Sequence, residues 1–205
     1  MKKQIFYIYI IFIVYSCGKV NPNQTIDEGK VDKNLYTSEE IGWTIRVPDG
    51  WDIVSMEQKK LQQEKGYEIL KDAIGEDFDC SQLKNLIGFK KDAFNMFQST
   101  SEPFDLEYEG EWEQNNQVLK ELMYTALEGQ GIKIDSTATT IEKVDGLDFH
   151  SFGFTIYSPE RKAILYQIVY SRLINGFDFS VNINYNSIKF KNEILNAWLK
   201  SKFKK

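Results

Sequence analysis

The sequence predicts an α+β domain built on an antiparallel β-sheet, whose C-terminal part is a meander of four consecutive strands. Two observations predict this class. Three turn signals divide residues 133–185 into four strand-like runs, and other stretches repeat apolar residues at helical spacing. The chain of 205 residues is long enough for one such domain with its own core and short for two. We therefore expect a single domain with about three helices packed on the sheet.

The folded part is expected to open with two short strands around a turn. Apolar and polar residues alternate over residues 43–47, which is typical of a half-buried strand. The tripeptide Pro48-Asp49-Gly50 is a turn sequence that ends this strand. Apolar residues resume over residues 51–54, and we interpret them as the second strand.

A helix, a hairpin and a second helix are expected next. Residues 56–74 repeat apolar residues on one helical face, with a weak point at Gly66. Two strands are expected around the turn Lys91-Asp92, over residues 83–89 and 93–97. Residues 111–127 follow helical spacing throughout, and the glycines directly after them indicate where this helix stops.

The C-terminal half is divided by the turn signals Asp145-Gly146, Ser158-Pro159-Glu160 and Asn175-Gly176. Asp-Gly and Asn-Gly pairs tolerate the positive φ angles of tight hairpin turns, so the runs that they separate are expected to pair as antiparallel neighbours. The third run is apolar on both faces and is expected to lie centrally with both faces covered. The four runs cover residues 133–143, 147–157, 163–174 and 177–185.

A last helix is expected after Ser187, which stands at the capping position before an apolar stripe. The residues of this stripe are Ile194, Leu195, Trp198 and Leu199.

The opening strand and the meander resemble the PsbP/Mog1 superfamily. The resemblance rests on Gly42-Trp43-Thr44-Ile45-Arg46-Val47-Pro48-Asp49-Gly50-Trp51, and on the meander followed by a helix and Ser201-Lys202-Phe203. It covers most of residues 36–205 and implies an α/β/α sandwich. Members of that superfamily act mainly as binding proteins, for example photosystem subunits and a small-GTPase binder, and share no catalytic residue set. The resemblance therefore implies a non-catalytic binding or assembly module without a cofactor, and it carries over no functional residue.

Residues 1–16 have the layout of a secretory signal peptide. Two lysines precede an apolar run of about 11 residues, and Ser16 stands directly before Cys17. The run is shorter than the roughly 20 residues that a helix needs to cross the hydrocarbon core. Residues 14–17 resemble the lipobox of a bacterial lipoprotein, although Tyr15 stands where a small residue is usual. An ordinary signal peptide, or an uncleaved anchor that contains a cysteine, is the alternative interpretation.

In the lipoprotein family the thiol of such a cysteine receives a diacylglycerol, the preceding peptide bond is cut, and the new amine is usually acylated. The resemblance implies that Cys17 becomes the first mature residue and holds the protein in the bilayer through its acyl chains. It places the protein in the bacterial cell envelope, as a lipid-anchored membrane protein that faces the periplasm. Residues 17–35 are then the lipidated cysteine and a flexible polar spacer, which would lift the domain at 36–205 by roughly 20 to 25 Å on average.

The charge balance indicates which partners to expect. The chain carries 25 basic and 30 acidic residues, a net charge of −5, and the signal peptide contains two of the lysines and no acid. An acidic mature chain argues against nucleic acid as a partner and against electrostatic adhesion to anionic lipid. We expect two partners instead, the lipid bilayer through acylated Cys17 and a protein of the envelope.

His150 is the only histidine, so a multi-histidine metal centre is excluded and any catalytic triad would have to use it. The apolar pattern changes phase there, from Leu147 and Phe149 to Phe152 and Phe154, and a β-bulge would explain the change. We interpret His150 as a half-exposed residue at a strand kink. The alternative is an envelope hydrolase that uses His150, which requires a Ser, Asp or Glu side chain within hydrogen-bond reach of its ring.

One face of the last meander strand is polar and is the expected ligand face. Odd-numbered residues from Phe177 to Tyr185 are apolar, whereas Ser180, Asn182 and Asn184 lie on the other side. A face that is merely wet or covered by a helix is the alternative.

The remaining chemical groups predict no metal site and no nucleophile. The acidic residues at 76–79 lack the ligand spacing and the central glycine of an EF-hand loop, so we interpret them as a solvated turn. The acids before Cys80 would raise the pKa of its thiol, which predicts an inert cysteine.

Overall fold

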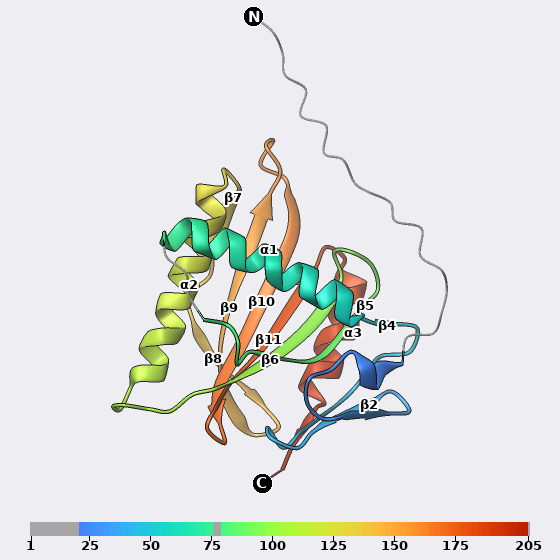
Figure 1. Ribbon diagram of the computed structural model, residues 1–205. Coiled ribbons are helices and arrows are strands. Elements are labelled where there is room, and N and C mark those ends of the chain that lie inside the picture. The colour runs from blue at the N-terminus through green and yellow to red at the C-terminus, as the bar shows by residue number, and fades with distance from the viewer. Residues whose placement is uncertain (1–20, 76–78, 205) are drawn as a thin grey trace, which may run out of the picture.

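The computed structural model describes residues 21–75 and 79–204 (Figure 1). Within these ranges a short 3-10 helix, η1 (Pro22–Gln24), precedes the helices α1 (Met56–Ile74), α2 (Glu111–Gly129) and α3 (Ile188–Leu199). The strands are β1 (Lys30–Asp32), β2 (Leu35–Ser38), β3 (Trp43–Arg46), β4 (Asp52–Ile53), β5 (Lys84–Lys90), β6 (Met96–Pro103), β7 (Lys133–Ser136), β8 (Thr140–Val144), β9 (Leu147–Tyr157), β10 (Ala163–Ile174), β11 (Phe177–Tyr185) and β12 (Lys202–Phe203).

The strands form two antiparallel sheets. The smaller sheet has the order β1-β2-β3-β12, and the larger has the order β4-β5-β6-β11-β10-β9-β7, with β8 also pairing with β9. β10 lies between β9 and β11, as its apolar character on both faces predicts. The meander from β9 to β11 is therefore confirmed.

The larger sheet lies between two layers. α1 and α2 cover one face, and α3 with the smaller sheet covers the other (Figure 1). On the α3 side the ring of Trp43 contacts Phe179 and Trp198, with centroids 5.0 and 6.0 Å apart. On the α2 side a second core joins Phe152, Phe154 and their neighbours to Met123, Tyr124 and Leu127 of the helix. The predicted α+β class, with three helices on an antiparallel sheet, is confirmed.

The local signals place most elements correctly. Asp145 and Gly146 have φ angles of 50° and 84°, and Asn175 and Gly176 have 53° and 79°. Both residues of each pair thus adopt the positive φ that a two-residue hairpin turn of this kind requires. Gly66 does not interrupt α1, which runs from Met56 to Ile74. Ser187 stands at the N-cap of α3 but makes no capping hydrogen bond with its side chain.

The first meander run, expected as one strand, is split into β7 and β8. Ser136 pairs with Phe154 and Thr140 pairs with Ser151. The segment from Ser136 to Thr140 thus advances four residues while β9 advances three, so one extra residue lies between β7 and β8. Thr137 fills the break, because its hydroxyl accepts a hydrogen bond from the backbone N–H of Gly153 at 2.8 Å. The irregularity of this region therefore lies opposite β9.

The expected β-bulge at His150 is wrong. β9 pairs with β10 without interruption from His150 to Ile156. The buried side chains change phase because the two ends of β9 serve different cores. Phe149 faces the α3 side, whereas Phe152 and Phe154 face α2.

The N-terminal segment also differs from expectation. Residues 21–35, predicted as part of a flexible spacer, contain η1, β1 and the start of β2. The backbone N–H of Asp27 donates to the Asn85 carbonyl at 2.9 Å, and the Asp27 carboxylate accepts from the Asn85 N–H at 2.7 Å. Lys59, only 4% exposed, donates through Nζ to the carbonyls of Thr25 at 2.5 Å and Leu86 at 2.6 Å. These hydrogen bonds hold the segment against the sheet, so the folded unit includes Asn21 onward. The signal peptide and Cys17 lie outside the described residues.

Candidate binding surfaces

Four residues singled out from the sequence lie on one face of the larger sheet. Cross-strand pairing aligns His150 with Ser171 of β10, and Ser171 with Ser180 of β11. Asn182 and Asn184 share this face, because alternate residues of a strand point the same way. It is the face that α1 and α2 cover (Figure 1).

His150 is half-buried beside α2. Its ring meets the edge of the Trp112 ring, with centroids 5.0 Å apart, and no hydrogen bond joins it to another of the described residues. The Ser171 hydroxyl, its cross-strand neighbour, accepts a hydrogen bond from the Asn116 amide at 2.6 Å. In the described part of the chain, therefore, no serine or carboxylate is held by the imidazole in the way that a hydrolase needs.

The three polar residues of β11 are half-buried rather than open. The Asn182 carbonyl oxygen accepts a hydrogen bond from the Gln167 amide at 2.9 Å, and Gln98 on the adjacent strand donates to Gln62 of α1 at 2.7 Å. The sheet face thus carries polar contacts to the helix above it. A ligand role for Ser180, Asn182 and Asn184 stays a prediction.

Two acids pair across strands at the end of the same face. Glu102 of β6 lies directly opposite Asp178 of β11. Burial raises the pKa of Asp178, and the Trp112 indole N–H opposes this shift without reaching hydrogen-bond geometry. Burial, followed by the negative charges of Asp178 and Asp79, raises the pKa of Glu102. No group of three or more His, Cys, Asp or Glu in the described ranges is arranged to hold a metal ion.

Cys80 is a half-buried free cysteine. Burial, followed by the charges of Glu102 and Asp79, raises the pKa of its thiol, in the direction that the sequence predicts. A thiol that resists ionisation is a poor nucleophile. Glu76 and Asp77, two of the acids before it, lie outside the described residues.

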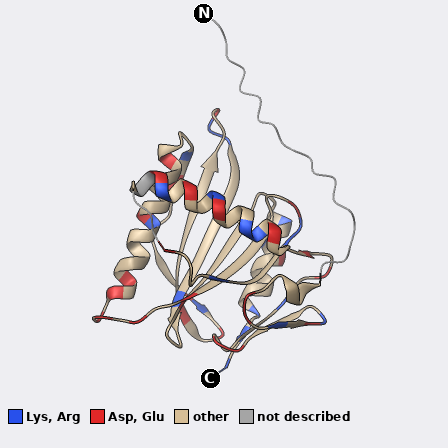
Figure 2. Cartoon of the chain, in the orientation of Figure 1, with Lys and Arg blue, Asp and Glu red and all other residues tan. Residues whose placement is uncertain are grey.

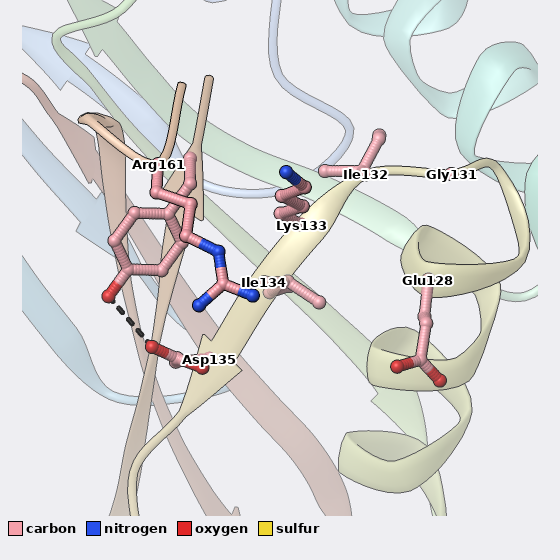
Figure 3. Close-up of a pocket in the computed structure, with 8 residues that line it drawn as sticks. Glu128, Gly131, Ile132, Lys133, Ile134, Asp135 and Arg161 are labelled. Atoms are coloured by element: carbon pink, nitrogen blue, oxygen red, sulfur yellow. Dashed lines mark hydrogen bonds between the residues drawn. The ribbon is translucent and has the colours of Figure 1, made fainter. Parts of the chain in front are cut away.

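A hollow of about 520 Å³ lies where the end of α2, the edge strand β7 and the β9–β10 turn meet (Figure 3). The chain leaves α2 through Gly131, whose φ of 75° allows the sharp turn into β7. Ile134 is 6% exposed and joins the second core, so the hollow has an apolar residue at its base. Its lining residues are Glu128, Gly131, Ile132, Lys133, Ile134, Asp135, Tyr157 and Arg161.

Charged groups of both signs surround this hollow. The Tyr157 hydroxyl donates to the Asp135 carboxylate at 2.7 Å, and this hydrogen bond raises the pKa of Tyr157. Lys133 Nζ donates to the Pro159 carbonyl at 2.9 Å. The Arg161 guanidinium reaches from the turn toward β7, and among the described residues no carboxylate forms a salt bridge with it (Figure 3). The hollow can therefore present a free guanidinium to a ligand.

Sequence reasoning did not find this hollow. Its side chains come from the end of α2, from β7 and from the β9–β10 turn, and only the pairing of β7 with β9 brings them together. The one local signal was Ser158-Pro159-Glu160, which predicts a turn but no ligand.

In the described ranges, no helix combines the length and the apolar character needed to cross a bilayer.

Comparison with known proteins shows the fold. No family model matches the chain, and no curated protein matches it significantly. Among solved structures, the chain is similar to the solution structure of cyanobacterial PsbP (CyanoP) from Synechocystis, with a TM-score of 0.55 and 10% sequence identity. The match covers 93% of this chain and 99% of that one. The domain thus has a PsbP-like fold, in agreement with the resemblance that its sequence shows.

Proposed function

We propose that this chain is a lipid-anchored binding or assembly module of the bacterial cell envelope, held by acylated Cys17 and without catalytic activity. The hollow beside β7 carries the binding part of the proposal. It combines an apolar base with carboxylates and with a guanidinium that no carboxylate of the described residues pairs with. The lipobox-like residues 14–17 support the anchor.

The chemistry of the hollow suits a polar segment of a partner protein. A guanidinium binds carboxylates through two parallel hydrogen bonds, which gives both affinity and orientation. The Glu128 and Asp135 carboxylates offer complementary positions for a cation, and Ile132 and Ile134 offer apolar contact. An envelope protein that presents a carboxylate beside an apolar side chain is therefore the proposed target.

The anchor is tested by Cys17→Ala in a bacterial host. We expect the variant to lose both acyl labelling and membrane association, because one mature residue supplies the whole lipid attachment. Cell fractionation with labelled fatty acid measures both. A variant that stays in the membrane fraction would refute the lipid anchor.

The binding role is tested by crosslinking from intact envelopes with the tethered chain. We expect Arg161→Ala to reduce recovery of the crosslinked partner about tenfold or more, the scale of a lost charge-assisted hydrogen bond. Lys162→Ala is the matched control, since Lys162 is an exposed cation of the same turn that does not line the hollow. Equal recovery with both variants would show that the partner binds elsewhere.

A further inference from the structure

The folded unit begins very close to the proposed lipid attachment point. Gly18, Lys19 and Val20 are the residues between Cys17 and Asn21, the first described residue. Even fully extended, four residue steps span at most roughly 14 Å. An anchor at Cys17 would thus hold the start of the folded unit closer to the bilayer than the roughly 20 to 25 Å expected on average for a flexible spacer that ends at residue 35.

The N-terminal segment of the folded unit contacts the first turn of α1. Lys59 in that turn binds the Thr25 carbonyl, and the neighbouring Gln58 accepts a hydrogen bond from Lys90 Nζ at 2.9 Å. Lys90 ends β5, so the N-terminal segment and the β5–β6 turn are attached to consecutive residues of one helix (Figure 1). The N-terminal segment from which the lipid anchor would extend and this turn are therefore attached to the same end of α1.

The start of α3 is joined to the same turn. The Asn95 amide donates to the Asn186 side-chain oxygen at 2.9 Å, and the Asn186 backbone N–H donates back to Asn95 at 3.1 Å. Each of these two residues stands close in the chain to an exposed apolar side chain, Phe94 directly before Asn95 and Ile188 two residues after Asn186. Phe94 is 52% exposed, and Ile188 is 67% exposed.

Three lysines lie close in the chain to the two apolar side chains. Lys91 is in the turn, where its Nζ donates to the Gly50 carbonyl at 2.6 Å. Lys189 and Lys191 are in the first turns of α3, with their Nζ atoms over the rings of Phe190 and Tyr185.

Of the acids at this end, Asp92 accepts hydrogen bonds from Asn95, and Glu193 accepts one from the Trp51 indole at 2.8 Å. Asp49, Asp52 and Glu57 also lie near this turn, and Figure 2 shows acidic as well as basic residues along α1. Exposed apolar side chains with lysines close by are found on surfaces that lie in the interface of a bilayer.

We propose that the β5–β6 turn and the start of α3 form a membrane-facing surface. Phe94 and Ile188 enter the interfacial region of the bilayer, and Lys91, Lys189 and Lys191 face anionic headgroups. The proposal rests on the lipid anchor at Cys17, which brings this end to the bilayer. It departs from the expectation drawn from net charge alone, because it depends on the exposed apolar side chains and the lysines of this end and not on the charge of the whole chain.

The test uses the full chain, lipidated in a bacterial host, with a photo-crosslinking residue at single positions. The test positions are Phe94→p-benzoylphenylalanine and Ile188→p-benzoylphenylalanine. The matched controls carry the same residue at Leu106, 51% exposed, and Val118, 61% exposed, which lie before and within α2. We expect lipid adducts at positions 94 and 188 at least fivefold above both controls, and a lower yield in purified vesicles without anionic lipid than in vesicles with it.

The outcomes separate this surface from the anchor. Equal lipid adducts at all four positions, or a protein adduct in place of lipid at 94 and 188, would overturn the membrane-facing surface while acyl labelling still supports the anchor. Loss of acyl labelling in the parent chain would instead overturn the anchor. An adduct yield that does not depend on anionic lipid would remove the role of the lysines.

Discussion

Lys59 shows how much one side chain contributes to this fold. It is buried, and burial lowers its pKa to about 8 although Asp27 opposes the shift. Its two hydrogen bonds join the N-terminal segment to β5. The sequence offers no sign of this, because Lys59 and the exposed Lys60 stand side by side in the same polar helix.

Replacement of Lys59 tests this role. Lys59→Met leaves the Thr25 and Leu86 carbonyls without their donor, and we expect the free energy of unfolding to fall by about 2–4 kcal/mol. Urea denaturation measures the change. Lys60→Met is the control and should alter stability by less than about 0.5 kcal/mol. Equal effects of the two substitutions would contradict a special role for Lys59.

The pH dependence of the same pair of proteins provides a second readout. The pKa of Lys59 is about 8 in the folded state and about 10.5 in the unfolded chain. The free energy of unfolding of the wild type therefore rises with pH between these two values, and the gain is lost as pH falls through about 8. The free energy of unfolding of the wild type should therefore exceed that of Lys59→Met by more at pH 9.5 than at pH 7. A constant difference would show that Lys59 stays charged in the fold.

At the scale of the element, strand register decides which side chains meet. Alternation predicts that Ser180, Asn182 and Asn184 share a face, and the structure confirms it. Alternation does not say which residues of the neighbouring strands lie beside them. The pairing register decides this, because a shift of the register by one residue would change every cross-strand partner. The pairing of Glu102 with Asp178 is an example, because it depends on β6 returning beside β11.

The raised pKa values of the cross-strand acids Asp178 and Glu102 predict that this pair lowers stability at neutral pH. Burial raises the pKa of Asp178. The contribution of Asp178 to the free energy of unfolding is therefore most favourable in the acid range, where the carboxyl is protonated, and is lost as pH rises. We expect Asp178→Asn to stabilise the fold by about 1 kcal/mol at pH 7.5, the scale of one poorly satisfied buried polar atom, and by less at pH 4.5. Urea denaturation at both pH values checks this.

The control for this prediction is Asp105→Asn, which changes an exposed acid just after β6 and should leave stability nearly unchanged. If Asp178→Asn destabilised the fold at pH 7.5, the contact of this carboxylate with the Trp112 indole would outweigh its burial.

At the scale of the whole molecule, the two sheets depend on contacts between distant segments. β3 and β12 pair although Thr44 and Lys202 are 158 residues apart, and this pairing closes the core around Trp43 and Trp198. The N-terminal segment, expected as a spacer, is held by β5 and α1. No local pattern records such pairings, because a strand edge accepts any segment that offers complementary backbone groups.

The sequence by itself determined the α+β class, the two tight hairpins and the helices, because turn residues and apolar periodicity act within a few residues of the chain. It also supplies the prediction of a lipid anchor at Cys17. The tertiary structure alone decided that two cores share β9, that Lys59 holds the N-terminal segment, and that Arg161 meets β7 in a hollow. The physical reason is that a pattern shows which face of an element is buried, whereas what covers that face depends on segments far away in the chain.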